Sequence, residues 1–547
     1  MANPSLQIGN SNWAIKEDDL LGYSTVGTNY LPKPMTMTRA SAGTRVNPQG
    51  LVETVELLGS ELITCGDFSC ATPSTYWTEV GNSSLVVGDY QGRTSVANIN
   101  ISGTANSDRI IQDFDYVSGV TYFISVDVYL VSGNFRVDTS NSFVPYDFIN
   151  TSTTGSWQTL TANFTATSTG TYQIWLRSSQ QIAQFYVSNV SVKEVTKNNL
   201  ARVDYDGTAS SLLVEPLRTN LVTYSEDFSQ SSWLRQNLTV ELNSSVSPSG
   251  NSNASKLVED SSNTTHRILT NAGLTISGDV SISVFAKKGE RNWIKLSNNN
   301  LVGAFFDLEN GVIGSVGSGI VAKIENYGNG WYRCSFTAAS VANERIGIYT
   351  SIDGINLTYQ GDGTSGVYVY GATIEIGSYA TSYIPTDGGT VTRVQETYEK
   401  TGISNLINSE EGVLFAEIAA LSDDGTFRSI SLSNGTATNR VSIRYNTTSN
   451  AISAYLYQGS TPILAYNNVV ADVKDFHKVA IKYKSGDVAF WVDGVEVATS
   501  TSTFTFLPLT DLSFFRGDSV RFFYGKVKQL QVFKTALTDT ELATLTQ

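Results

Sequence analysis

Apolar and polar residues alternate along many short stretches of this chain. Clear examples are VTYFISVDVYL (120–130), DVSISVFAK (279–287) and KVAIKYK (478–484). A period of two puts one set of side chains in a core and the other in solvent, which is the pattern of antiparallel sheets. Turn dipeptides such as Asn310-Gly311 and Asp493-Gly494 separate such stretches, as expected between the strands of hairpins. The pattern predicts a protein built almost entirely of β-strands.

One series of predicted strands occurs twice, each time after a similar phrase. The first phrase, LITCGDFSCATPSTYW, covers residues 62–77, and the second, NLVTYSEDFSQSSW, covers residues 220–233. After each phrase come an alternating strand, a strand that starts with a tryptophan (Trp157 or Trp331) and a closing aromatic strand. An internal repeat of this kind indicates tandem copies of one fold, here two jelly-roll β-sandwiches. We therefore expect the matching tryptophans of the two copies to occupy equivalent places.

The last 150 residues contain a third set of predicted strands. GVLFAEIAAL (412–421) opens it, DFHKVAIKYKSGDVAFWVDGVEVATS (475–500) reads as consecutive hairpins, and FYGKVKQLQVFK (523–534) is a final strand. A short helix should follow, because Thr538 and Glu541 have the spacing of a capping box. The sequence predicts a third sandwich that ends in this helix.

The length and composition agree with several all-β domains. Of the 547 residues, 41% are hydrophobic and only 16% are charged. We predict an all-β chain of tandem β-sandwiches behind an extended N-terminal segment. The predicted units are the N-terminal segment (1–58), the first jelly-roll module (59–196), a connector (197–221), the second jelly-roll module (222–397) and the C-terminal sandwich (398–547). The first unit has too few apolar residues for a core, so we expect a partner to bury it.

The charge of the chain argues against binding to nucleic acid. The net charge is −14 and the pI is about 4.7, and we find no stripe of Lys and Arg that could offset the resulting field. No apolar run approaches 18 residues, and the start, MANPSLQIGN, lacks the charged and apolar regions of a signal peptide. We expect that the protein does not insert into a membrane and that it is made in the cytoplasm.

Several longer motifs resemble a known group of proteins. TMTRASAGTRVNPQGLVETV (36–55), LARVDYDGTASSLLVEPLRTNLVTYSEDFSQSSW (200–233) and GVYVYGATIEIGSYATSYIPT (366–386) resemble structural proteins of tailed phages, in which a jelly roll like a carbohydrate-binding module follows such a lead-in. INSEEGVLFAEIA (407–419) and FYGKVKQLQVFKTALTDTELATL (523–545) resemble the laminin-G-like, or concanavalin A-like, lectin sandwiches. The first jelly roll thus looks like a duplicate that lies between two pieces of a common connector.

The resemblance implies a function and a location. It implies a bacteriophage virion structural protein, a fibre, spike or decoration on the head or tail, whose sandwiches bind cell-surface glycans for adhesion to the host. It also implies that residues 1–58 bind other virion proteins, that the protein is a homotrimer, and that it is exposed on the released virion. The alternative is a purely structural decoration or cement protein that binds no ligand.

Aromatic side chains are the candidates for sugar binding. Trp157 and Trp331 each begin a predicted strand, and we interpret them as core residues because repeated aromatics usually fill the same part of a repeated core. Trp233 and Trp293 border polar, loop-like segments, where a core and a surface position are both open. The candidates for stacking on a sugar are Trp233, Trp293, Trp491, Tyr455 and Tyr457.

No catalytic residues can be named from the sequence, so we predict that the protein is not an enzyme. We find no array of alternating carboxylates like that of glycosidases with this fold. The only histidines, His266 and His477, have no nucleophile that the sequence places beside them. Calcium is the one cofactor worth weighing: Asp362 and Asp424 lie in Asp-Gly-rich stretches that either donate to Ca²⁺ or only form turns. Cys65 and Cys70 either pair after release into an oxidising medium or remain buried thiols.

Overall fold

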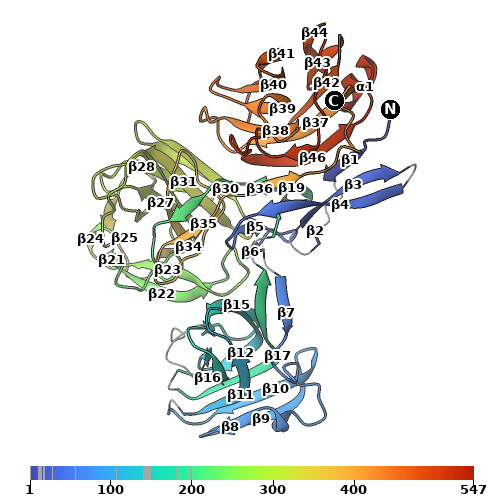
Figure 1. Cartoon of the computed structure of the whole chain (residues 1–547). Helices are drawn as coiled ribbons and strands as arrows, with labels where there is room; N and C mark the ends of the chain where they lie inside the picture. Colours follow the sequence, from blue (N-terminus) through green and yellow to red (C-terminus); the bar gives the residue numbers. More distant parts are fainter. Residues whose placement is uncertain are drawn as a thin grey trace.

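The computed structural model has three β-rich lobes (Figure 1), and it confirms the predicted all-β fold class. It describes residues 2–9, 15–16, 19–26, 29–55, 57–105, 107–139, 149–179, 181–197 and 200–547. Within these ranges the only α-helix is α1 (Asp539–Leu545), which begins at the predicted capping box of Thr538 and Glu541. No helix in the described part of the chain is long and apolar enough to cross a membrane.

The first module packs two antiparallel sheets around one core. One sheet has the order β15-β12-β17-β10-β9, with β7 also paired to β17, and the other has the order β14-β13-β16-β11-β8. The strands are β7 (Leu57–Glu61), β8 (Thr78–Val80), β9 (Ser83–Tyr90), β10 (Arg93–Ile101), β11 (Arg109–Tyr116), β12 (Thr121–Ser132), β13 (Phe135–Thr139), β14 (Ile149–Thr151), β15 (Trp157–Thr165), β16 (Gly170–Arg177) and β17 (Ala183–Lys197). On β12 every second side chain from Tyr122 to Leu130 enters the core, as the alternating pattern predicts.

The second module repeats this strand order. Its sheets run β22-β23-β34-β26-β31-β30 and β21-β25-β32-β27-β28-β29. The strands are β21 (Trp233–Gln236), β22 (Leu238–Ser245), β23 (Ala254–Glu259), β25 (Arg267–Thr270), β26 (Asp279–Lys288), β27 (Trp293–Ser297), β28 (Gly303–Asp307), β29 (Val312–Val316), β30 (Val321–Asn326), β31 (Trp331–Ala339), β32 (Gly347–Ser351) and β34 (Gly366–Ile376), with the small pair β24 (Asn263–Thr265) and β33 (Thr358–Gln360) beside them. The order β9-β10-β17-β12-β15 thus reappears as β22-β23-β34-β26-β31, as expected for two copies of one module.

The third lobe is a sandwich of two larger sheets. One contains β46 (Gly525–Phe533), β37 (Glu411–Ala420), β42 (His477–Lys484), β43 (Val488–Val492) and β44 (Val495–Ser500), each paired with the next. The other contains β36 (Thr397–Lys400), β45 (Asp511–Ser513), β38 (Arg428–Ser433), β39 (Asn439–Tyr445), β40 (Ala451–Gln458) and β41 (Thr461–Val469). Their inner faces share one apolar core.

Strands from the beginning of the chain complete this C-terminal sandwich. β1 (Leu6–Gly9) pairs with β46, and β4 (Asn29–Thr38) pairs with β36 of the other sheet. Between them, β3 (Asp19–Val26) pairs with both β1 and β4, so this hairpin joins the two sheets. The side chains of Leu6, Ile8, Met35 and Met37 lie in the same core as those of the C-terminal strands. The expectation that a partner protein buries residues 1–58 therefore needs correction for Leu6, Ile8, Met35 and Met37, because the C-terminal strands of the same chain bury these side chains.

The connector also joins the C-terminal sandwich. β18 (Arg202–Asp206) and β19 (Ala209–Val214) form a hairpin, and β19 continues the pairing along β46 beyond β1. The remaining short strands are β2 (Ile15–Lys16), which pairs with β3, the pair β5 (Thr44–Val46) and β6 (Val52–Thr54), and the pair β20 (Arg218–Asn220) and β35 (Val391–Arg393). Figure 1 shows β19 and β36 between the second module and the C-terminal sandwich.

Five buried charges hold the junction together, and we call them the charge clasp: Arg39, Arg202, Glu215, Arg393 and Glu396. Their side chains are at most 3% exposed. Glu396 contacts Arg39 and lies 2.5 Å from Nη2 of Arg202, while Glu215 lies 2.8 Å from Arg202 and 3.0 Å from Arg393. Burial opposes ionisation, but the Arg393 and Arg202 guanidiniums outweigh it and hold the pKa of Glu215 well below its usual range. Three of these residues belong to the stretches 36–55 and 200–233, so these two stretches meet in space although residues 59–196 separate them.

Candidate binding faces of the three sandwiches

The repeated Asp-Phe-Ser phrase forms the same local structure in both modules. In the first, Ser69 donates its amide and hydroxyl to Asp67, and in the second Ser229 does the same to Asp227. The phenylalanine of each phrase packs against the tryptophan that ends it, with ring centroids 5.4 Å apart for Phe68 and Trp77 and 4.8 Å apart for Phe228 and Trp233. The phrase therefore closes one end of each core.

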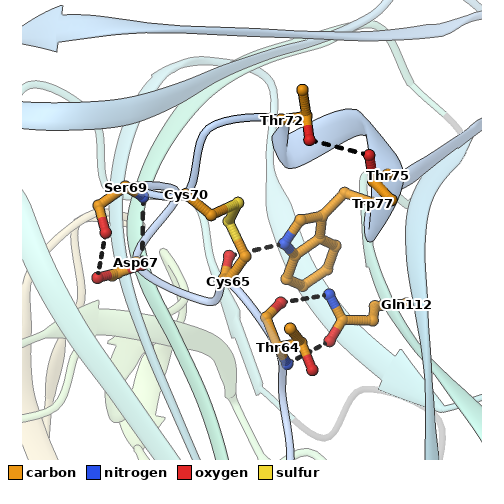
Figure 2. Close-up of a disulfide and its surroundings, with 9 residues drawn as sticks. All are labelled: Thr64, Cys65, Asp67, Ser69, Cys70, Thr72, Thr75, Trp77 and Gln112. Atoms are coloured by element: carbon orange, nitrogen blue, oxygen red, sulfur yellow. Dashed lines mark hydrogen bonds between the residues drawn. A yellow bond between two sulfur atoms is a disulfide. The ribbon is translucent and has the colours of Figure 1, made fainter.

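This arrangement corrects the prediction that Trp233 binds sugar. Trp77 and Trp233 are each only 2% exposed. The indole N–H of Trp77 donates to the carbonyl of Cys65 at 3.0 Å (Figure 2), and that of Trp233 donates to the carbonyl of Tyr224 at 2.9 Å. A tryptophan with no accessible ring face cannot stack on a ligand, so Trp233 is a core residue. The polar loop beside it is what made it look exposed in the sequence.

In the first module a disulfide reinforces this loop. Cys65 and Cys70 are bonded in the structure and enclose Asp67 and Ser69 (Figure 2). This decides between the two alternatives that the sequence left open for these cysteines. The second module lacks cysteines in the matching phrase, and the third cysteine of the chain, Cys334, is free and buried.

Two further tryptophans differ from their predicted places. Trp331 is 1% exposed, as the core interpretation requires, but its counterpart Trp157 is only half-buried and lies opposite Tyr129, with Arg93 4.2 Å from its ring. Trp491 was a predicted sugar-binding residue, yet it is 7% exposed and packs in a small core with Leu537 and Leu542. Helix α1 covers this side of the sheet, so Trp491 has no accessible ring face and that prediction is wrong.

Trp293 lies where a ligand can reach it, on the outer face of the second module. It points to the same side of the sheet as Lys295, while Ile294 and Leu296 between and after them point into the core. The indole ring lies against Gly354, where an added Cβ would stand 2.5 Å from it. One side of the half-buried ring is therefore held by the protein. The binding role of Trp293 stays a prediction.

The residues around Trp293 form what we call the module-2 face: Trp293, Lys295, Phe305, Tyr349 and Arg267. Lys295 pairs with Phe305 on one neighbouring strand and with Tyr349 on the other. Arg267 donates to the Tyr349 hydroxyl at 2.7 Å, and burial lowers the pKa of Lys295. Phe305 and Tyr349 are buried, whereas Trp293, Lys295 and Arg267 are half-buried. The half-buried ring of Trp293, with Lys295 two residues further along the same side of the strand, is thus available to a ligand with both apolar and hydroxyl surface.

The first module also has an aromatic residue on the outer face of this sheet, Trp175 on β16, the strand that corresponds to β32. It pairs with Asp138 of β13. Arg109 stacks on the Trp175 ring at 4.0 Å. Trp175 was not among the predicted sugar-binding residues, although Trp175 lies in the alternating run of β16 on the side opposite the core residues.

Tyr455 and Tyr457 lie on the outer face of the C-terminal sandwich. They alternate on β40 with the core residues Ala454 and Leu456, and both are half-buried. Their rings are nearly parallel, with an interplanar angle of 8° and centroids 6.3 Å apart. Their position leaves the predicted sugar-binding role open, and it stays a prediction.

The two predicted calcium ligands do not come together. Asp362 belongs to the second module and accepts hydrogen bonds from the amides of Thr364 and Ser365 at 2.8 and 2.7 Å. Asp424 belongs to the C-terminal sandwich, and both of its oxygens lie 2.7 Å from Arg428. Within the described ranges, no three His, Cys, Asp or Glu side chains gather where they could hold a metal ion. The contacts of Asp362 are those of a loop and the contacts of Asp424 are those of an ion pair, and calcium binding at either residue stays a prediction.

Both histidines are held by neighbouring loops. His266 is buried, with Nε2 3.2 Å from an oxygen of Asp260 and its ring 4.7 Å from that of Tyr359. Nδ1 of His477 lies 2.6 Å from Asp493 and its Nε2 lies 3.0 Å from the carbonyl of Asp472. These contacts fix loop ends against strands.

Comparisons with known proteins bear on the C-terminal sandwich. Residues 414–543 match the family model of the concanavalin A-like lectin/glucanases superfamily. No curated protein sequence matches the chain.

Several solved structures resemble parts of the chain. They include CBM40 of the Ruminococcus gnavus IT-sialidase bound to α2,3-sialyllactose (16% identity, 27% of this chain and 91% of that chain, TM-score 0.24). They also include the tandem CBM22 domains of Paenibacillus barcinonensis Xyn10C (16%, 59% and 98%, 0.22) and domain 4 of the Geobacillus stearothermophilus arabinanase AbnA in complex with arabinotriose (15%, 29% and 77%, 0.23). The family match shows that the C-terminal sandwich has the concanavalin A-like fold, as predicted.

Proposed function

We propose that this protein binds glycans through the outer faces of its sandwiches. The observation that carries the proposal is the module-2 face, where the half-buried ring of Trp293 lies flat against Gly354 and has cationic side chains beside it. A pyranose ring has an apolar C–H face and a rim of hydroxyls, so it can stack on the indole while Lys295 or Arg267 donates to its oxygens. The family match of residues 414–543 to a lectin-containing superfamily supports the same function.

We further propose that the protein is a virion component of a tailed phage, exposed on the head or tail, where it holds glycans of the host surface. The motifs around the charge clasp support this setting through their resemblance to phage structural proteins. Single sugar sites are weak, and linking several of them raises the effective concentration for each further contact. Three sandwiches per chain, in a homotrimer, would provide such repeated contacts.

A glycan array with the full chain tests the proposed binding. The expected result is reproducible binding to a set of glycans that falls about fivefold or more in Trp293→Ala, because one stacking contact contributes on the order of 1–3 kcal/mol. Val316→Ala is the matched control: Val316 lies on β29 of the same sheet and is 45% exposed, so its removal should change nothing. An array that stays flat with the unchanged protein would reject glycan binding and favour the structural decoration or cement role.

A further inference from the structure

The outer face of the C-terminal sandwich carries stacked rings and guanidinium groups, which we call the arginine–tyrosine face. Its members are Phe427, Arg440, Arg444, Tyr455, Tyr457 and Arg521. Arg440 and Arg444 alternate on β39 with the core residues Val441 and Ile443, so they lie on the side of the sheet that faces away from the core. The neighbouring strand β40 brings the two tyrosines to the same side.

Aromatic rings, rather than carboxylates, hold these guanidiniums in place. Arg440 lies 4.5 Å from the centre of the Tyr457 ring, and Arg444 lies 3.6 Å from that of Tyr455. Arg444 is also 5.0 Å from the ring of Phe427. Stacking occupies the flat surface of a guanidinium but leaves the N–H groups at its edge free to donate. The Nε atoms of both arginines are buried and have no hydrogen-bond partner in the described part of the chain.

The positive charge of this face is poorly balanced. A loop adds two more arginines, Arg521, which lies 4.4 Å from the centre of the Phe427 ring, and Arg516. Among the described residues, the ion pair between Arg516 and Asp518 is the only one that Arg440, Arg444, Arg516 or Arg521 makes. Burial and the nearby Arg516, Arg444 and Arg521 lower the pKa of Arg440 to about 10. A chain with a net charge of −14 thus gathers four arginines and one carboxylate on this sheet face and in the loop beside it.

We propose that the arginine–tyrosine face binds an acidic polysaccharide, with the guanidinium edges on its carboxylate, sulfate or phosphate groups and the two tyrosines along its sugar rings. This proposal rests on the proposed glycan binding and names the class of glycan for this one site. Charge complementarity selects the anion, because charge-assisted bonds from an arginine fork are among the strongest polar contacts. The neighbouring, nearly parallel rings of Tyr455 and Tyr457 favour a chain of sugars, because the apolar faces of two successive sugars can lie on the two tyrosine rings.

Nucleic acid fits this face less well than a polysaccharide does. A duplex is bound by neutralising many phosphates along an extended basic surface. Here the cations are confined to a few positions on β39 and one loop, which are too few to neutralise the phosphates along a duplex.

Titration of the full chain with four polymers tests the proposal: sodium alginate, dextran sulfate, neutral dextran and a DNA duplex. The variants are Arg521→Gln, which removes one cation from the loop, and Asp518→Asn, which removes the only carboxylate paired within the cluster. Lys323→Gln is the matched control, because this lysine of the second module has the same charge and its side chain is 67% exposed. Circular dichroism and thermal unfolding confirm that each variant is folded.

We expect at least one of alginate and dextran sulfate to bind at least tenfold more tightly than dextran, with binding that weakens as salt is added. Arg521→Gln should weaken this binding by about tenfold, and Asp518→Asn should strengthen it severalfold, a gain that misfolding cannot produce. The two acidic polymers distinguish carboxylate from sulfate recognition. Equal affinity for dextran, no response to either loop variant, or equal affinity for DNA would overturn the proposal. If the protein still binds glycans on an array and loses that binding in Trp293→Ala, the general glycan-binding function survives that result.

Discussion

Glu396 of the charge clasp is the residue at which the junction can be tested most sharply. It is fully buried and contacts Arg39, Nε and Nη2 of Arg202 at 2.9 and 2.5 Å, and the amide of Glu215 at 2.9 Å. Glu396→Gln keeps the size of the side chain but removes the negative charge, so two buried guanidiniums lose their main counter-charge. Removing one partner of a buried ion pair costs about 3–5 kcal/mol. We expect a loss of this size in the free energy of unfolding of the C-terminal sandwich.

Hydrogen exchange followed by mass spectrometry measures this loss where it occurs. The amides of β1, β19 and β46 should exchange roughly two to three orders of magnitude faster in Glu396→Gln, while those of the first module stay unchanged. Glu309→Gln is the control, because Glu309 and its partner Lys288 are each 44% exposed and such a pair contributes at most about 1 kcal/mol. If Glu396→Gln and Glu309→Gln gave the same exchange at β46, the clasp would not stabilise the junction and the reasoning would fail.

Acid should weaken the same junction, because burial raises the pKa of Glu396 but the Arg202 and Arg39 guanidiniums outweigh burial and lower the pKa in the folded state. The stabilisation by Glu396 is therefore fully present above the unfolded-state pKa of about 4.3 and is lost as the pH falls through the lower folded-state pKa. Faster hydrogen exchange of the β19 amides at low pH measures this loss. A chain that starts at residue 40 loses four core side chains worth roughly 6–12 kcal/mol in total, so calorimetry should show that the C-terminal transition disappears while those of the two modules remain. Trp233→Ala should lower the free energy of unfolding of the second module by about 3–5 kcal/mol, without the selective loss of glycan binding expected for Trp293→Ala. An equal loss of binding at unchanged stability would contradict the core role of Trp233. Reduction of the Cys65–Cys70 disulfide should destabilise only the first module, by about 2 kcal/mol for so short a loop, and thermal unfolding with and without reductant measures this.

Local patterns in the sequence identified the strands, the repeat and the capped helix, because each has a signal within a few residues. Period-two burial on β12 and the Thr538 capping box are of this kind. The docking of β1 on β46 had no such signal: Ser5 bonds to Val532, 527 positions away, and nothing near either residue specifies the other. A non-local pairing of this kind leaves no mark in composition or spacing.

The candidate site was predicted less well than the fold, and the reason lies in side-chain direction. A tryptophan beside a polar loop has the same sequence context whether its ring points in, as for Trp233, or out, as for Trp293. Trp491 is buried by a helix that the sequence predicted but could not place. In contrast, the alternation on β39 already puts Arg440 and Arg444 on one outer face, so the arginine–tyrosine face could have been found from sequence.

The pairing of β1 with β46 has a consequence for synthesis of the protein. The ribosome makes β1 long before β46, so β1 emerges without its partner and must wait while both modules are translated and fold. Until then, the apolar side chains of Leu6 and Ile8 have no core to enter. The C-terminal sandwich therefore closes only after β46 has been translated, and a chain that terminates before β46 would carry two folded modules preceded by an unpaired, apolar strand.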